Sequence, residues 1–256
     1  MKLIILAAGR GSRMGSVTDH KPKCLVEYRG KTLIKRTLDL ASAYQFEKII
    51  LVGGYKFDLL KSYVLGLGLD ESKIIFIENR DYQNTNMVES LFCAETEFNT
   101  DIVVTYSDIS YGREVLDQLV AFDKEISVIV DKSWMDLWSL RMEDPLEDAE
   151  TLKINSKGCI TELGLKPKEI GEIQGQYIGL FSFPIEQINQ IREVYHSLDR
   201  DHCYQGRQFK QMFMTTFLQI LIDRGFDLHA RWIEGGWLEI DTESDLISYQ
   251  RVPPVD

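Results

Sequence analysis

The sequence predicts an α/β fold, in which helices flank a mostly parallel central sheet and a smaller antiparallel insertion is added. Short runs rich in β-branched residues alternate with amphipathic stretches between residues 2 and 106, the order expected of βαβ units. Shorter strand-like runs follow beyond about residue 126. The 256 residues, 44% of them hydrophobic, suffice for one large core, and no repeat or linker divides them. We therefore expect a single domain over residues 1–256.

In the first half of the chain, expected strands and helices alternate. Each expected strand is a short apolar run, as in a parallel sheet that is buried on both faces. The strands are expected at residues 2–7, 48–54, 73–78 and 101–106, and the helices at residues 32–45, 57–67 and 86–98. Because crossovers between parallel strands are right-handed, these helices should cover both faces of the sheet.

The second half opens with a strand at residues 126–131 and then changes character. A charged stretch with tryptophans runs to about residue 150 and precedes short strand-like pieces, a pattern typical of antiparallel structure. We therefore place the insertion at roughly residues 131–183. Its strand-like pieces lie at 151–155, 159–165 and 175–183, and beyond them we expect helices at 185–198 and 209–225, strands at 228–233 and 237–241, and a last helix from residue 242.

Charge and cysteine content exclude several classes of function. The net charge of -11 argues against nucleic acid or a membrane surface as a partner, because both demand a basic field. The four cysteines are scattered without a C-x-x-C pair, which fits reduced thiols better than a zinc or redox motif. The apolar run at residues 3–8 is shorter than a membrane span. We expect a soluble, cytoplasmic protein.

The stretch LAAGRGSRMG, residues 6–15, follows the first expected strand and predicts a phosphate-binding loop. At this position glycines let backbone N–H groups approach phosphate oxygens closely. A dinucleotide fingerprint needs G-x-G-x-x-G, whereas Gly9, Gly11 and Gly15 give G-x-G-x-x-x-G. A P-loop is excluded as well, since Leu25 stands where the first glycine of the motif around GKT is required.

Four basic residues lie in or just after this loop in an otherwise acidic chain. They are Arg10, Arg13, Lys21 and Lys23, opposed only by Asp19. Arginine binds phosphate oxygens in a bidentate manner, and lysine acts on a phosphoryl group as a point charge. A solvated basic loop could carry the same residues. The combination of strand, glycine loop and basic cluster favours a phosphorylated ligand.

LAAGRGSRMG and the later HKPKCL together resemble the signature L-A-A-G-x-G-[ST]-R-[ML] … K-P-K-x-L of nucleotidyltransferases, which join a nucleoside triphosphate to a phosphorylated small molecule. Further likeness in VGGYK, SDISY, IGLFSF and WLEIDTESDL extends over nearly the whole chain. The resemblance implies a Rossmann-like nucleotidyltransferase fold. It also implies a catalytic pair, with Arg13 at the β- and γ-phosphates and the leaving pyrophosphate, and Lys23 at the α-phosphate.

The same resemblance implies a set of nucleotide-binding residues. The loop backbone would cradle the nucleotide, and residues from later segments would lie near the base and ribose. The expected residues are Leu6, Ala7, Ala8, Gly9, Gly11, Ser12, Arg13, Lys23, Gly54, Tyr55, Asn86 and Ser90. CTP is the favoured nucleotide, although the sequence does not separate it from UTP or dTTP.

Two aspartates stand directly after expected strands, at the sheet edge where the glycine loop opens. Asp108 follows residues 101–106, and Asp241 ends the stretch GWLEID. Either could be a turn or cap residue, and Asp241 or Thr242 could cap the last helix. The resemblance implies instead that both aspartates bind a metal, so we expect Mg²⁺ as the cofactor.

The acceptor side departs from the sugar-1-phosphate members of this superfamily, which carry an E-K-P motif. Here Lys166 and Pro167 match, but Leu165 replaces the glutamate, which argues against a sugar acceptor. The surrounding segments resemble cytidylyltransferases that act on phosphocholine, aminoalkylphosphonates or phosphoglutamine, with phosphoglutamine preferred. An aromatic face can hold an ammonium group, and arginine can meet a carboxylate or phosphate. The expected acceptor-binding residues are Trp134, Trp138, Arg141, Lys166 and Tyr177.

For two of these residues a structural interpretation stays open, because Trp134 and Trp138 are spaced i, i+4 and could simply pack one helical face. The prediction as a whole is a magnesium-dependent nucleotidyltransferase that transfers CMP from CTP to a small phosphorylated or phosphonate acceptor and releases pyrophosphate. The resemblance also implies a role in making capsule or cell-surface precursors, and it allows a homodimer.

Three alternatives remain at this point. The first is a sugar-1-phosphate nucleotidyltransferase that uses UTP or dTTP. The second is a glycosyltransferase, although SDIS offers one acid where a D-x-D element has two. The third is a non-catalytic nucleotide-sensing subunit, against which the presence of Arg13, Lys23, Asp108 and Asp241 argues.

Overall fold

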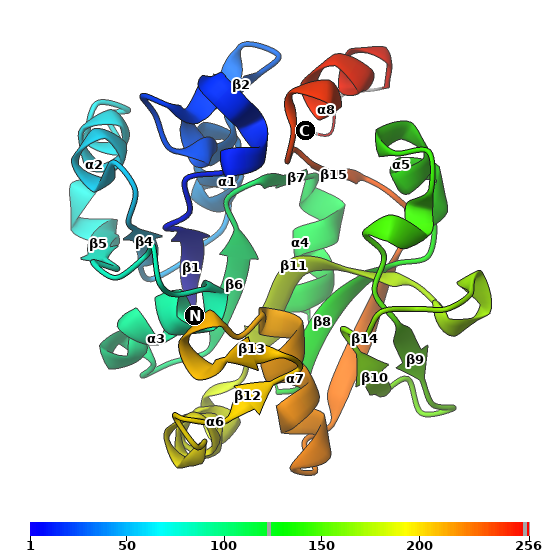
Figure 1. Ribbon diagram of the computed structural model, residues 1–256. Helices are drawn as coiled ribbons and strands as arrows, with labels where there is room; N and C mark the ends of the chain where they lie inside the picture. The colour runs from blue at the N-terminus through cyan, green and yellow to red at the C-terminus, as the bar shows by residue number, and fades with distance from the viewer. Residues whose placement is uncertain (122–123, 253–254, 256) are drawn as a thin grey trace.

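The computed structural model describes residues 1–121, 124–252 and 255. Seven strands form its central sheet, in the order β14-β8-β11-β6-β1-β4-β5 (Figure 1). Neighbouring strands pair in parallel except β11, which runs antiparallel to both β6 and β8. The strands are β1 (Lys2–Ala7), β4 (Ile49–Gly53), β5 (Ile74–Glu78), β6 (Ile102–Tyr106), β8 (Ile126–Asp131), β11 (Gln176–Phe183) and β14 (Leu228–Ile233). The predicted mostly parallel sheet is confirmed.

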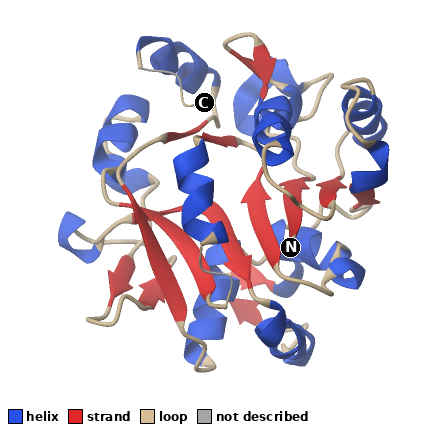
Figure 2. Ribbon diagram, turned by 180° about the vertical axis from the view of Figure 1, so that it is seen from behind, coloured by secondary structure: helices blue, strands red, loops and turns tan. Residues whose placement is uncertain are grey.

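Helices cover both faces of this sheet (Figure 2). Side chains alternate along each strand, so in β1 Leu3 and Ile5 enter one core while Ile4 and Leu6 enter the other. The first core is covered by α1 (Leu33–Ser42), α2 (Phe57–Leu65), α4 (Arg113–Val120) and α5 (Trp134–Arg141), and the second by α3 (Met87–Cys93), α6 (Ile185–Ser197) and α7 (Met214–Asp223). A short last helix, α8 (Glu243–Ser248), follows.

Outside the central sheet, the described residues form four two-stranded sheets. They are β9 (Leu152–Ile154) with β10 (Ile160–Leu163), β7 (Ile109–Tyr111) with β15 (Trp237–Glu239), β2 (Glu27–Tyr28) with β3 (Lys31–Thr32), and β12 (Cys203–Tyr204) with β13 (Arg207–Gln208). The segment expected as an antiparallel insertion therefore divides. β9 and β10 form a separate hairpin, whereas β11 pairs within the central sheet. Strand β7 and helix α4 were not among the elements expected from the sequence.

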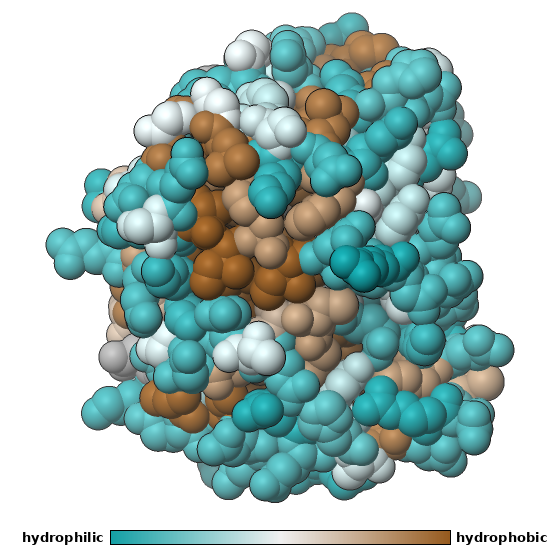
Figure 3. All heavy atoms as spheres, turned by 90° about the vertical axis from the view of Figure 1, so that its left-hand side faces the viewer, coloured by the Kyte–Doolittle hydropathy of each residue, from teal (hydrophilic) through white to brown (hydrophobic). Residues whose placement is uncertain are grey.

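Strand β5 is one edge of the central sheet, and among the described residues no strand pairs with its outer side. Its four apolar residues 74–77 are only half-buried, and Leu59 and Leu65 of α2 are exposed. Figure 3, which looks at the side carrying α2 and β5, shows a broad hydrophobic area. Within the described residues, no helix combines the length and the apolar character needed to cross a membrane.

Strand β11 is irregular where it passes Tyr106, at the end of β6. Its pairing with β8 shifts register between Tyr177 and Phe181, and Gly179 between them has φ of +84°. A β-carbon on Gly179 would lie 2.5 Å from Cδ2 of Tyr106. Both the left-handed backbone and the close approach of the Tyr106 ring therefore require glycine at this position.

Gly179→Ala should destabilise the fold by about 1–3 kcal/mol, because it adds a steric clash to a strained backbone. Gly158→Ala is the matched control, since Gly158 also has positive φ (+81°) but faces open space. Urea unfolding of both variants separates the two effects. Equal losses of unfolding free energy would mean that Tyr106 imposes no constraint on Gly179.

Candidate active site

Two adjoining cavities open at the carboxyl edge of the central sheet. The first, about 300 Å³, is lined by the glycine loop and is called the loop cavity here. The second, about 420 Å³, is lined by several aromatic rings and is called the aromatic cavity. Arg13, Met87 and Tyr106 line both cavities. A ligand in one cavity can therefore reach a ligand in the other.

Most of the predicted nucleotide and metal residues line the loop cavity. They are Leu6, Ala8, Gly9, Gly11, Ser12, Arg13, Lys23, Asn86, Ser90, Asp108 and Asp241. Ala7, Gly54 and Tyr55 do not line it. Tyr55 instead supports the loop from outside, because its N–H donates to the carbonyl of Ala8 at 2.9 Å and its hydroxyl donates to the carbonyl of Asp19 at 2.6 Å.

The sequence of the loop explains its shape. Gly11 has φ of +74°, and a β-carbon there would lie 2.7 Å from Cβ of Lys23. Only glycine therefore lets the Lys23 side chain pass beneath the loop. A 3-10 helix, Ser12–Thr18, follows, and the Thr18 hydroxyl donates back to the Gly11 carbonyl at 3.0 Å.

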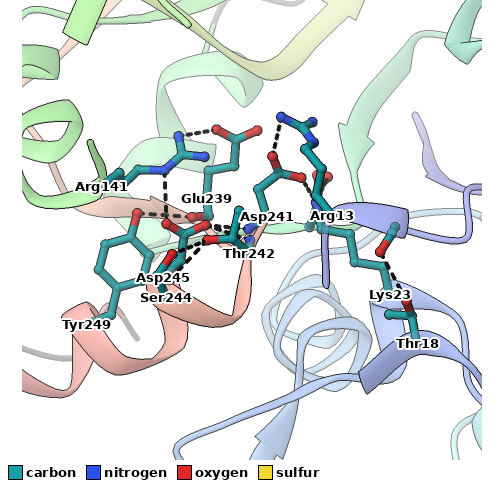
Figure 4. A network of polar contacts seen from close by, with 12 residues as sticks. Arg13, Thr18, Lys23, Arg141, Glu239, Asp241, Thr242, Ser244, Asp245 and Tyr249 are labelled. Atoms are coloured by element: carbon teal, nitrogen blue, oxygen red, sulfur yellow. Dashed lines mark hydrogen bonds and ion pairs between the residues drawn. The ribbon is translucent and has the colours of Figure 1, made fainter. Parts of the chain in front are cut away.

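Lys23 is the centre of the charged cluster in the loop cavity. Its Nζ lies 2.7 Å from Oδ2 of Asp108 and 2.5 Å from Oδ1 of Asp241, and its side chain is only 8% exposed. Burial lowers the pKa of Lys23, but the charges of Asp108 and Asp241 outweigh burial and raise that pKa above its usual range. Arg13 reaches the other oxygen of Asp241 at 2.5 Å (Figure 4).

Local hydrogen bonds bring the two aspartates together. Strand β7 pairs with β15, and the N–H of Ile240 donates to the carbonyl of Asp108 at 2.9 Å. Thr242, not Asp241, caps helix α8: its hydroxyl accepts from the N–H of Asp245 in a capping box. The Asp241 carboxylate is therefore left to face the cavity.

The residues present fit a magnesium ion. Among the described residues no three histidine, cysteine, aspartate or glutamate side chains cluster as a metal site. Asp108 and Asp241 nevertheless converge on one cationic atom, Nζ of Lys23. Magnesium typically takes one or two carboxylates together with substrate phosphates and water. The carboxylates of Asp108 and Asp241, beside the glycine loop, match the protein part of that donor set.

The aromatic cavity combines rings with acidic groups. Tyr106, Trp138, Tyr177 and Trp237 line it, as do the carboxylates of Asp148, Glu150 and Glu239. Arg13 is the one cationic side chain among the described residues that line it. The indole N–H of Trp138 is buried and has no hydrogen-bond partner within the described structure. Such a wall suits a ligand that carries a cationic group and hydrogen-bond acceptors.

The structure brings only two of the five predicted acceptor residues, Trp138 and Tyr177, to this cavity. Trp134 is buried and packs edge-on against Trp138, which matches the structural interpretation of their spacing. Nζ of Lys166 donates to the carbonyls of Leu146 and Glu147, beside a neighbouring cavity. The Arg141 guanidinium is likewise bound, to Glu239 and Asp245.

The comparisons with known proteins give the family. The family model of the MobA-like NTP transferase domain matches residues 3–152. The chain belongs to this family. Over 252 residues it is 41% identical to the CTP:phosphoglutamine cytidylyltransferase of Campylobacter jejuni, covering 96% of this chain and 98% of that protein. It is thus an enzyme of the nucleotidyltransferase class.

Other relatives of this nucleotidyltransferase handle different substrates. A UTP--glucose-1-phosphate uridylyltransferase of Haloferax volcanii is 37% identical over 251 residues, which cover 96% of this chain and 93% of the relative. The solved inositol-1-phosphate CTP transferase from T. maritima superposes with a TM-score of 0.75 at 21% identity, over 99% of this chain and 97% of that one. The last comparison confirms the predicted nucleotidyltransferase fold.

Sequence reasoning missed several residues that line the cavities of this nucleotidyltransferase. Glu239 was within reach, because it stands two residues before Asp241, and residues at that spacing on a strand share a face. Tyr106 ends β6 immediately before the loop of Asp108 and could be found in the same way. Glu150 carried no local signal, since its position depends on how the insertion packs.

Glu150 is unusual among the carboxyl groups of the nucleotidyltransferase. Burial raises its pKa to about 7; the hydrogen bond from Thr215 opposes this shift, and the charges of Asp148 and Glu239 add to it. In an unfolded chain the pKa of glutamate is about 4.3. Between these two values the folded protein binds more protons than the unfolded chain. The contribution of Glu150 therefore makes the fold less stable as the pH rises through that window.

Glu150→Gln should remove this pH dependence. Glu150→Gln should be more stable, relative to the wild type, at pH 8 than at pH 5, and we expect this difference in unfolding free energy to be about 2–3 kcal/mol. Denaturant unfolding at the two pH values measures the difference. Glu143→Gln, at an exposed glutamate, is the control. If the difference in unfolding free energy between Glu150→Gln and the wild type does not change with pH, the raised pKa of Glu150 is contradicted.

Proposed function

We propose that the protein is a magnesium-dependent cytidylyltransferase that transfers CMP from CTP to a small phosphorylated acceptor and releases pyrophosphate. The observation that carries this proposal is the cluster of Lys23, Asp108 and Asp241, which lies in the loop cavity next to the aromatic cavity. The identity with the Campylobacter jejuni cytidylyltransferase supports CTP as the nucleotide.

The reaction would proceed in line at the α-phosphorus of CTP. An oxygen of the acceptor phosphate forms the new P–O bond while the bond from the α-phosphorus to the oxygen bridging to the β-phosphate breaks, so that pyrophosphate leaves with that electron pair. No general base is needed, because the phosphate oxygen is already ionised at neutral pH. A magnesium ion held by Asp108 and Asp241 would offset the phosphate charge.

The side chains of the loop cavity supply the remaining electrostatic stabilisation. Lys23 is buried and charged, so its ammonium would contact the α-phosphate without being screened by water. Arg13 is 65% exposed and borders both cavities, which lets it follow the β- and γ-phosphates and the departing pyrophosphate. The backbone of the glycine loop would hold the triphosphate in place.

The aromatic cavity would bind the acceptor, and its chemistry favours a molecule with an ammonium group. Asp148 and Glu239 provide negative charge, and Glu150, with its pKa of about 7, adds to that charge as it deprotonates. Trp138 provides an aromatic face and an unpaired N–H. Phosphoglutamine carries an ammonium and a carboxylate at the end remote from its phosphate, and it is the acceptor we propose. A sugar-1-phosphate with UTP is the second candidate, favoured by the Haloferax volcanii relative.

A pyrophosphate-release screen separates these candidates. It crosses CTP, UTP and dTTP with phosphoglutamine, phosphocholine, aminoethylphosphonate and glucose-1-phosphate, with and without Mg²⁺. We expect turnover with CTP and phosphoglutamine that disappears when EDTA is added. Selective turnover of UTP with glucose-1-phosphate would instead support the second candidate, and no turnover of any pair would support a nucleotide-sensing subunit.

Lys23→Ala should lower kcat by about 10²–10³-fold, since it removes a buried cation from the transition state. The fold should persist, because Asp241 keeps its contact with Arg13. Lys21→Ala is the matched control, since Lys21 lies in the same segment but lines neither cavity. The readouts are pyrophosphate release and circular dichroism. Near-normal turnover of a folded Lys23→Ala protein would remove Lys23 from the mechanism.

A further inference from the structure

Arg141 is buried between the insertion and the segment that carries Asp241. It ends helix α5, and its side chain is 3% exposed. Its Nη1 lies 2.5 Å from Oε2 of Glu239, and its Nε lies 3.4 Å from Oδ1 of Asp245 (Figure 4). Its guanidinium is 5.4 Å from the centre of the Trp138 ring. One side chain thus joins three structural units: α5, β15 and α8.

The partner carboxylate, Asp245, determines the backbone around Asp241. Its Oδ2 accepts hydrogen bonds from the N–H groups of Asp241 and Thr242, both at 2.8 Å. A capping box requires only the second of these bonds, to the cap residue Thr242. The additional bond fixes the peptide group from which the Asp241 side chain departs.

Burial makes this arrangement depend on Arg141. Asp245 is 2% exposed, and its carboxylate needs a compensating charge at that depth. Among the described residues, Arg141 is the only side chain that forms an ion pair with Asp245. Loss of the guanidinium would leave a buried, uncompensated carboxylate. Rotation of that carboxylate would break its hydrogen bond with the N–H of Asp241.

We propose that Arg141 is a positioning residue that holds Asp241 in the loop cavity and Glu239 in the aromatic cavity at a fixed separation. It lines neither cavity itself, so it acts through the two carboxylates that it binds. This role replaces the contact with the acceptor that the sequence suggested for Arg141. The inference rests on the function proposed above, because it concerns the aspartate that would hold the metal.

The test measures metal binding separately from turnover. Mn²⁺ replaces Mg²⁺ and is titrated by electron paramagnetic resonance into the full chain with saturating CTP. For Arg141→Gln we expect the Kd of Mn²⁺ to rise about 10-fold and kcat to fall about 10–100-fold, with KM for CTP nearly unchanged. The Kd of Mn²⁺ and the kcat of Arg141→Lys should lie between those of Arg141→Gln and the wild type, because lysine keeps the charge but cannot bridge both carboxylates.

Asp245→Asn gives an independent arm of the same test. Asparagine removes the charge, so the ion pair with Arg141 is lost, and the unanchored amide can rotate its oxygen away from the N–H groups of Asp241 and Thr242. We expect the same rise in the Kd of Mn²⁺. The double variant, Arg141→Gln with Asp245→Asn, should lose no more affinity than either single variant, because both act through one contact.

Arg231→Gln is the control for loss of an arginine that is mostly shielded from solvent, with a side chain 13% exposed. Arg231 lies on β14 and binds Glu125 and Ser127 at the start of β8. It should lower stability without changing the Kd of Mn²⁺. A folded Arg141→Gln with wild-type Mn²⁺ affinity, or additive losses in the double variant, would overturn the proposal.

If Arg141→Gln does not fold, the Kd of Mn²⁺ measured for Arg141→Lys and Asp245→Asn tests the proposal instead. Wild-type protein that binds no Mn²⁺ with CTP would count against the proposed function. The inference about Arg141 fails when the wild type binds Mn²⁺ and the variants bind it equally well, or when the losses of the two single variants add in the double variant.

Discussion

The site depends on one ammonium group, that of Lys23, held between the carboxylates of Asp108 and Asp241. Two convergent carboxylates repel each other, and removing them from water adds a further cost. The lysine cation balances both carboxylates, and together with Arg13 it compensates the buried charge of Asp241. The same convergence of carboxylates is what a divalent cation requires. The lysine therefore belongs to the architecture of the site as well as to its chemistry.

The fold serves this contact from three directions. Gly11 leaves a passage for the lysine side chain, the pairing of β7 with β15 brings the two aspartates to one place, and Asp245 fixes the backbone beside Asp241. Each of these is a local structural feature at the carboxyl edge of the sheet. None would work alone, because the cluster joins residues from both ends of the chain.

Much of this could be predicted from the sequence. The alternation of strands and helices indicated the sheet, and the glycine loop with Asp108 and Asp241 indicated its functional edge, because these signals lie in short stretches. Arg141 and Lys166 were assigned to the acceptor, but in the structure Arg141 binds Asp245 and Lys166 donates to backbone carbonyls. Side-chain direction across an insertion has no local signal. The homodimer and the cytoplasmic location stay predictions.

The two cavities are built from largely separate parts of the chain, and within the described residues they share only Arg13, Met87 and Tyr106. Positions such as Asp148 and Glu150 of the insertion line the aromatic cavity and no part of the loop cavity. Under the proposed function, substitutions there would change the acceptor and leave the residues of the loop cavity untouched. The scaffold is therefore open to evolutionary divergence, and libraries for altered acceptors can be confined to the insertion.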